Sequence, residues 1–195
     1  ATQKNVMLGD GVTNVSDGLL SGFKALETVS LGKGITTIAN NTFKGCTSLK
    51  SIELSEGLTS IGNDAFNGCT RLDTVDLKKA RALKTLGRSA FEGCTALTEI
   101  EIPDAVTEIG NNAFNGCSKL IKVDISPYSK LTTIGGGAFI NSEVPYFYIP
   151  SGVTVGQQAF FFGKEPTNKK VTYDLSGWDT KNLNTSVFGK WCFSQ

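Results

Sequence analysis

Cysteine is the residue type best suited to chemistry in this chain, because the 195-residue sequence contains no histidine. Without imidazole, Ser-His-Asp and Cys-His catalysis and histidine-ligated zinc are excluded. Four of the five cysteines recur at near-constant spacing, each three residues after a phenylalanine: Cys46, Cys69, Cys94 and Cys117. Such a series could hold a metal ion, undergo thiol–disulfide exchange, or simply belong to a structural repeat.

The spacing of these cysteines argues against a metal or redox site. No CxxC pair is present, and equivalent positions of stacked repeats form a line instead of a tetrahedral cage. Equivalent side chains also point the same way, which does not suit a disulfide. We therefore expect small, buried hydrophobic side chains here, with no metal or other cofactor. Cys192 lies outside the series, and the sequence leaves its redox state open.

A repeat of 23 or 25 residues positions the cysteines, with the consensus LxxIxIxxxVxxIGxxAFxGCxx. The alternation in LxxIxI is typical of a half-buried strand, and AFxGC predicts one short helical or 3-10 turn. So short a unit cannot bury its apolar face alone, so the copies must stack with one parallel strand per turn. The phenylalanines expected in the core are Phe43, Phe66, Phe91, Phe114 and Phe139.

This unit resembles the BspA-type (Treponema pallidum-type) leucine-rich repeat of bacterial surface proteins, over roughly residues 6–160. The Ile-Pro step of that family is present in "EIPDAV" (101–106) and "YIPSGV" (148–153), whereas other copies replace the proline with Ser, Gly or Lys. The resemblance implies a leucine-rich-repeat solenoid with a parallel β-sheet on the concave face. Short helical or 3-10 turns and loops would form the convex face. It also implies secretion or surface display, and a use in adhesion or binding of host proteins.

The array is expected to occupy residues 1–165, followed by a C-terminal repeat remnant and cap at 166–195. "KVTYDL" (170–175) is a last, weaker copy, and the aromatic residues of the cap are Trp178, Phe188, Trp191 and Phe193. Phe161 and Phe162 are expected either to form an exposed apolar patch or to pack under this segment. The sequence starts without a signal segment, and we expect that one was removed from an extracellular or cell-surface protein.

The third and fifth positions of LxxIxI face away from the core and are the first candidates for partner binding. These candidate residues are Glu53, Asp76, Glu99, Glu101, Asp124, Tyr146 and Tyr148. Carboxylates on neighbouring strands repel each other by about 1 kcal/mol in water. An acidic stripe with tyrosine anchors fits a basic partner. It equally fits a solvated face that discourages aggregation between sheets.

Two insertions provide a second candidate surface. The 25-residue units carry two extra residues just after the strand, in "LKKARAL" (77–83) and "ISPYSKL" (125–131). We expect both loops to project from one edge of the rod and to cluster Lys78, Lys79, Arg81, Tyr128 and Lys130. Insertions on one face can mark a binding edge, although a tolerated surface insertion is an equal alternative.

Composition and the open sheet argue against several classes of function. A net charge of +1 and the lack of a long apolar run predict neither nucleic-acid binding nor membrane insertion. Carboxylates on adjacent turns could approach a glycosidase pair, but an open sheet offers no cleft, so we expect no catalysis. The resemblance to the BspA-type family then implies a noncatalytic, secreted or surface-displayed domain for protein binding or adhesion, with host matrix or another surface protein as the partner. A structural spacer or self-association module of a larger surface protein is the alternative, and the oligomeric state stays open.

Overall fold

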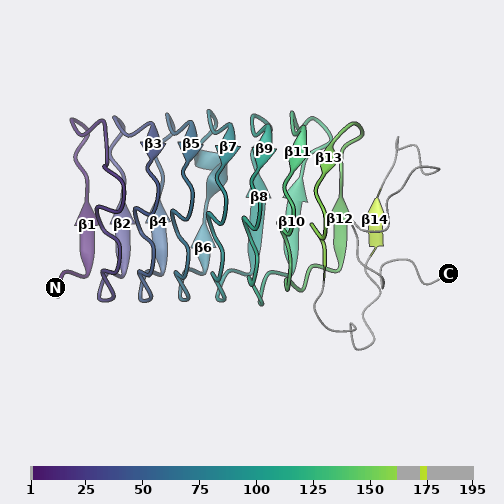
Figure 1. The fold of residues 1–195 in the computed structure, drawn as a ribbon. Helices are drawn as coiled ribbons and strands as arrows, with labels where there is room; N and C mark the ends of the chain where they lie inside the picture. Colours follow the sequence, from purple (N-terminus) through teal and green to yellow (C-terminus); the bar gives the residue numbers. More distant parts are fainter. Residues whose placement is uncertain (1, 162–171, 175–195) are drawn as a thin grey trace.

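The computed structural model describes residues 2–161 and 172–174, which wind into a solenoid whose turns lie side by side (Figure 1). Each turn contributes one strand to a first parallel sheet and, over most of the array, one to a second. The first sheet, formed by the LxxIxI segments, contains β1 (Asn5–Met7), β2 (Thr28–Ser30), β4 (Ser51–Glu53), β6 (Thr74–Val75), β8 (Glu99–Ile102), β10 (Lys122–Ile125), β12 (Tyr146–Tyr148) and β14 (Thr172–Asp174). The second contains β3 (Thr37–Ile38), β5 (Ser60–Ile61), β7 (Thr85–Leu86), β9 (Glu108–Ile109), β11 (Thr133–Ile134) and β13 (Thr154–Val155).

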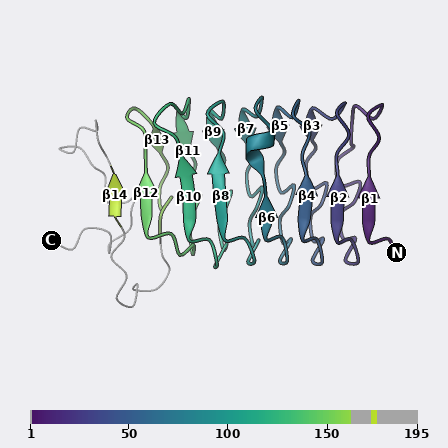
Figure 2. The same ribbon diagram turned by 180° about the vertical axis from the view of Figure 1, so that it is seen from behind.

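The second sheet is the main difference from the sequence-based expectation of one strand per turn. Its strands are only two residues long and come from the VxxIG segments, which we had interpreted as turns. All six pair in one continuous parallel ladder, with equivalent residues opposite each other, as in Ile61 against Leu86. Figures 1 and 2 show this order of strands from opposite sides of the array.

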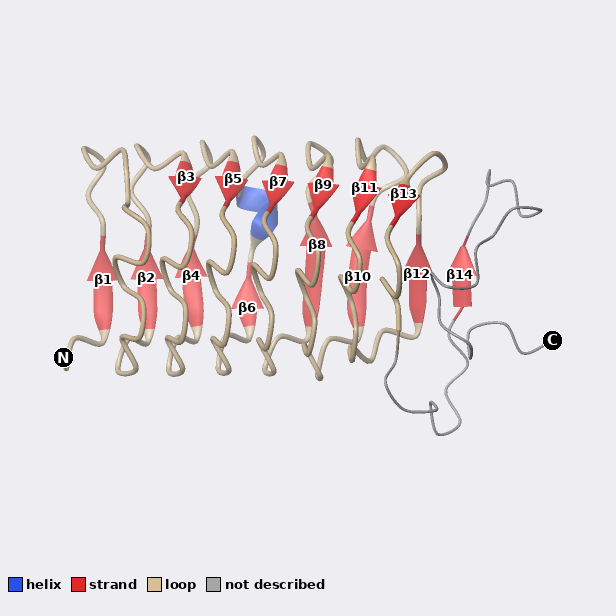
Figure 3. Cartoon of the chain, viewed as in Figure 1, coloured by secondary structure: helices blue, strands red, loops and turns tan. Residues whose placement is uncertain are grey.

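The first sheet, in contrast, is divided into three ladders: β1-β2-β4-β6, β8-β10 and β12-β14. Both divisions follow a 25-residue unit, and the first of them coincides with η1 (Leu77–Lys79), a 3-10 helix that directly follows β6 and contacts β8. Figure 3 shows η1 as the one helix of the described residues. At the first division the strand ends early, because β6 stops at Val75 and η1 begins at Leu77, and β6 and β8 do not pair. β14 lies within the predicted last copy and pairs in parallel with β12.

The AFxGC segments are hydrogen-bonded turns and not helical elements. The Cys69 amide donates to the Phe66 carbonyl at 3.0 Å, a bond that spans three residues. The Phe66 amide, however, donates to Ala90 of the next turn at 2.7 Å. Because amides are used alternately within and between turns, no run of helical hydrogen bonds can build up. Asp64 and Gly68 have positive φ values of 55° and 74°, which reverse the chain twice within each turn.

The core is a column of phenylalanine rings that runs along the solenoid. Phe66 stacks between Phe43 and Phe91 with ring centroids 5.2 and 5.0 Å away, and all three are fully buried. The column continues through Phe114 and Phe139 to Phe160. Offset stacking of this kind adds to the burial energy of each ring. The expected solenoid with parallel sheets is therefore confirmed, although it contains almost no helix.

Candidate functional site

The outward face of the first sheet holds the acidic and tyrosine residues predicted from the sequence. Alternation places the buried side chains of β8, Ile100 and Ile102, inside, and Glu99 and Glu101 outside. The other predicted residues occupy equivalent outward positions on or directly after β4, β6, β10 and β12: Glu53, Asp76, Asp124, Tyr146 and Tyr148.

Two lysines from η1 lie across this face. Lys78 Nζ is 2.6 Å from Glu101 Oε2 on β8, and Lys79 Nζ is 3.5 Å from Glu53 Oε1 on β4. The hydrogen bond to Glu101 is the main cause that raises the pKa of Lys78. The first insertion therefore places its lysines against the sheet and links the turns on both sides of β6.

The remaining carboxylates differ in their partners. Asp124 pairs with Lys122 on the same strand, with Nζ and Oδ2 2.8 Å apart, and this hydrogen bond raises the pKa of Lys122. Ser30 donates to Glu53 at 3.0 Å. Asp76 and Glu99 form no ion pair with any residue of the described chain. The acidic stripe is thus partly neutralised by direct ion pairs, while Asp76 and Glu99 are exposed and interact with Lys78 and Lys122 only at longer range.

A hollow of about 390 Å³ lies on this face, where the first sheet is interrupted. Its lining comes from β6 and η1 on one side and from β8 and β10 on the other. The lining contains five carboxylates and two ammonium groups: Asp73, Asp76, Glu99, Glu101 and Asp124, with Lys78 and Lys122. The hollow therefore combines backbone that is not paired across the interruption with an excess of negative charge.

The C-terminal end of the same face is apolar and aromatic. Tyr146 is 48% exposed, and Tyr148 is half-buried and packs against the core. Ile121, which precedes β10, is 55% exposed, and Pro145, which precedes β12, is exposed as well. The outward positions of the first sheet thus change from charged to aromatic along the solenoid.

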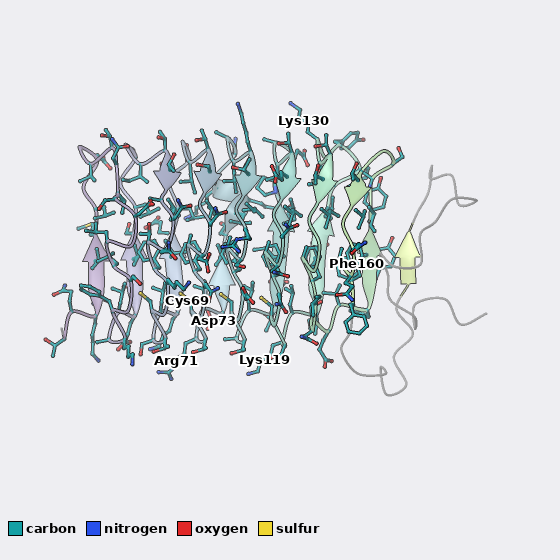
Figure 4. All side chains as sticks on the ribbon, viewed as in Figure 1. Cys69, Arg71, Asp73, Lys119, Lys130 and Phe160 are labelled. Carbon is teal, nitrogen blue, oxygen red and sulfur yellow. The ribbon has the colours of Figure 1, made fainter. Side chains whose placement is uncertain are left out.

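The predicted loop-edge residues do not form a single contact cluster. Lys78 and Lys79 pair with the first sheet, while Arg81, Tyr128 and Lys130 are exposed. The two loops are separated by a complete turn, and no hydrogen bond or ion pair links them within the described residues. Figure 4 places Lys130 on the long edge opposite the one with Arg71, Asp73 and Lys119.

The repeated cysteines are buried and free, with no disulfide among the four. Burial is the first cause that raises their thiol pKa values, to about 12 for Cys117. Within residues 2–161 and 172–174, no three His, Cys, Asp or Glu side chains are grouped so that they could bind a metal ion. Cys192 lies outside the described residues, as do Phe162 and the predicted cap with Trp178, Phe188, Trp191 and Phe193.

One charged cluster was missed by the sequence analysis. Glu27 lies between Lys4 and Lys50 of the preceding and following turns, at 2.9 and 2.8 Å. These hydrogen bonds, first that of Lys50 and then that of Lys4, lower the pKa of Glu27 to about 2. The sequence does contain a sign of this cluster, because the charge at the second position of LxxIxI alternates between successive repeats, from Lys4 to Glu27 to Lys50.

Comparison with known protein families identifies the family to which this chain belongs. The sequence matches the family described as "BspA type Leucine rich repeat region (6 copies)" over residues 2–80 and 36–168. The chain belongs to the BspA-type leucine-rich repeat family. Comparison with curated proteins gives no significant match. Within the described segments, no helix has the length and apolar character needed to cross a membrane.

Several solved structures of leucine-rich repeat proteins share this fold. A leucine-rich cell surface protein from Faecalibacterium prausnitzii is 26% identical with a TM-score of 0.70, over 82% of this chain and 45% of that protein. A leucine-rich repeat protein of T. pallidum is 24% identical with a TM-score of 0.58, over 74% of this chain and 79% of that one. A Bacteroides ovatus leucine-rich repeat protein, also 24% identical, has a TM-score of 0.57 and is covered over 45% of its length. The chain thus spans less than half of the Faecalibacterium and Bacteroides proteins.

Proposed function

We propose that this BspA-type array is a noncatalytic binding module that attaches to a protein partner through the outward face of the first sheet. The observation that carries the proposal is the composition of that face. Charged side chains of both signs from several turns, an acidic hollow and an aromatic end with Tyr146 and Tyr148 share one side. Aromatic anchors beside polar contacts are typical of protein interfaces.

The rigidity of the solenoid supports binding without a large ordering cost. Each turn is tied to the next by backbone hydrogen bonds, such as that from Phe66 to Ala90 at 2.7 Å, and by the column of stacked rings. The described residues contain no buried side-chain nitrogen or oxygen that lacks a hydrogen-bond partner. A surface fixed in this way loses little conformational entropy when a partner binds.

The proposal extends to secretion or surface display and to adhesion, with host matrix or another surface protein as the partner. Its support is the family assignment together with the Faecalibacterium neighbour, which is described as a cell surface protein. Catalysis is not part of the proposal, because the face is an open sheet, and Glu27, whose pKa is lowered to about 2, is held ionised by two lysines. A general acid requires the opposite shift of its pKa.

The test is binding of the purified chain to arrayed matrix and surface proteins, before and after substitution of the face. Glu53→Gln, Asp124→Asn and Tyr146→Ala together should abolish binding, since they remove charge and an anchor without a change in the core. The matched control is Thr37→Ala, Thr85→Ala and Thr133→Ala, at outward positions of the second sheet. Equal binding by both triple variants would exclude the first face as the interface.

Self-association is the alternative function of this face. Binding and sedimentation of the parent and the face variant distinguish it from binding of another protein. If the face variant binds every partner as the parent does but sediments as a smaller species, the array is a self-associating or spacer module. If the parent is monomeric and binds a matrix protein, the proposed function holds.

A further inference from the structure

The first sheet is interrupted between β6 and β8, whereas the rest of the solenoid continues at the same level. β6 and β8 belong to different ladders, but β7 and β9 of the second sheet still pair there. The AFxGC segments are joined as well: the Phe91 amide donates to Ala113 at 2.8 Å, and the rings of Phe91 and Phe114 stack at 5.3 Å. The array therefore has an N-terminal block (residues 2–94) and a C-terminal block (97–161), which are bonded along the second sheet and the AFxGC turns but do not pair along the first sheet.

This boundary between β6 and β8, which we call the seam, also lacks a bond that precedes the strand in other turns. The Ile121 amide donates to Thr98 of the preceding turn at 2.9 Å, but within the described residues no equivalent bond runs from Thr98 to Asp73. At the second division of the sheet, in contrast, the Glu143 amide still donates to Leu120 at 2.9 Å. Because Asp73 and Thr98 are exposed, water can bond to their backbone groups. Separation of the first-sheet segments at the seam therefore breaks no backbone hydrogen bond between them.

A side chain of η1 crosses the seam in place of backbone bonds. Lys78 Nζ of the N-terminal block lies 2.6 Å from Glu101 Oε2 of the C-terminal block, and Lys78 attracts Asp124 of that block at longer range. The next residue, Lys79, pairs with Glu53 of its own block at 3.5 Å. The Lys78 and Glu101 side chains are 63% and 42% exposed, so their ion pair is weak and sensitive to salt.

We propose that the seam is a hinge, at which the first-sheet sides of the two blocks open and close about the continuous second sheet. The Lys78–Glu101 ion pair is the latch that favours the closed form. Opening separates β6 from β8, while backbone pairing keeps β7 beside β9. The amplitude is limited, because Leu77 and Ala80 of the insertion are buried and a wide opening would expose them to water. The hinge is a property of the array and does not depend on the proposed partner.

The test compares distances across the seam on the two sheets by pulsed electron paramagnetic resonance. In a Cys192→Ser background, one protein carries nitroxide labels at Thr28→Cys and Lys122→Cys on the first sheet. A second protein carries them at Thr37→Cys and Thr133→Cys on the second sheet. Each pair is four strands apart in its sheet and spans the seam, and the four repeated cysteines are buried. We expect the first-sheet pair to show an additional, longer distance whose population rises with salt, and the second-sheet pair to show one narrow distribution at every salt concentration.

Removal of the latch should increase the population of the open form. Lys78→Met should raise the population of the longer distance about two- to five-fold, as expected for the loss of one exposed ion pair. The matched control is Lys79→Met, which removes the same charge from the same helix but from an ion pair within the N-terminal block, and should leave the distances unchanged. Equal effects of the two substitutions would overturn the latch. A single narrow distribution for the first-sheet pair in the parent and in Lys78→Met, or equally broad distributions on both sheets, would overturn the hinge.

Discussion

The thiol of Cys69 donates a hydrogen bond to the backbone carbonyl of Phe43, one turn earlier, with 3.1 Å between Sγ and O. The same carbonyl accepts the Cys46 amide at 3.1 Å, so both of its lone pairs are used. Cys46, Cys94 and Cys117 make the equivalent bonds to Leu20, Phe66 and Phe91. The cysteine column is therefore a series of side-chain bonds between turns, which explains why a donor stands at a fully buried position.

Replacement of the Cys69 thiol should lower the free energy of unfolding by a measurable amount. Cys69→Ala removes the hydrogen bond and leaves a small cavity, so we expect a loss of about 1–2 kcal/mol in the free energy of unfolding. Cys69→Ser should lose less, because a hydroxyl at this position can still donate: Ser142, at the equivalent position, donates to the Phe139 carbonyl of its own turn at 2.9 Å. Denaturant unfolding of the two variants measures the difference. Equal losses would mean that the donor has no role and that volume alone matters.

The four buried thiols should not react with thiol reagents in the folded chain. Burial raises the pKa of Cys94 well above its ordinary value of 9.0, and that of Cys117 to about 12. The reactive thiolate is thus absent near neutral pH. In a Cys192→Ser background, a coloured disulfide reagent at pH 8 should detect no thiol before denaturation and four afterwards. Rapid reaction of any thiol in the native protein would contradict this account of the column.

The ring column should be the most sensitive part of the core. Phe66 is fully buried between two rings at 5.2 and 5.0 Å, so Phe66→Ala should cost about 3–5 kcal/mol. Phe66→Leu, which keeps most of the volume, should cost about 1–2 kcal/mol. Thermal unfolding measures both values. An unchanged midpoint for the alanine variant would mean that turns on either side of Phe66 do not depend on its packing.

How far the sequence predicts this structure depends on the range of the interactions. The phase of the Phe, Cys and Leu columns follows from spacing alone, because each repeat buries the same positions. The second sheet was not predicted, since strands such as Ser60–Ile61 have no periodicity of their own. They exist through hydrogen bonds between turns, such as Lys84 to Thr59 at 2.8 Å, which a single repeat does not show.

The candidate site was predicted less completely, for a related reason. The outward carboxylates and tyrosines follow from strand alternation, but the ion pairs depend on the path of an insertion. Lys78 and Lys79 were assigned to a loop edge because the sequence does not reveal that η1 turns them toward Glu101 and Glu53. The interruption of the sheet at the same place was also missed. A two-residue length difference marks it in the sequence, but the effect on pairing appears only in three dimensions.

A left-handed residue in every turn gives a test of backbone strain. Ser89 is buried and has a φ of 53°, in a column that also contains Asn41, Asp64, Asn112 and Gly137. Ser89→Val should cost about 2–3 kcal/mol, because a β-branched residue is strained there. Ser89→Gly should stay within about 1 kcal/mol of the parent, since relief of strain offsets the added chain entropy. If valine is tolerated as well as glycine, this position adopts another backbone conformation in solution.

The Lys4–Glu27–Lys50 cluster should make stability depend on pH in the acid range. Its lysines lower the pKa of the Glu27 carboxyl from 4.5 to about 2 in the folded chain, while the unfolded chain keeps the ordinary value. A group whose pKa is depressed by folding stabilises the native state above its unfolded pKa. The contribution of Glu27 is therefore complete above about pH 5 and disappears as the pH falls from 4.5 through 2. Glu27→Gln, which cannot ionise, should lack this part of the pH dependence.

Denaturant midpoints of the parent and the Glu27→Gln variant, measured from pH 6 to pH 2, check this expectation. The parent should be more stable at pH 6, and the two curves should converge toward pH 2. Because both lysines are exposed, 1 M salt, which screens charges beyond about 3 Å, should reduce the difference at pH 6. A carboxyl titration by NMR gives the pKa directly. A midpoint at 4.5 for Glu27 would show that neither lysine holds it in solution.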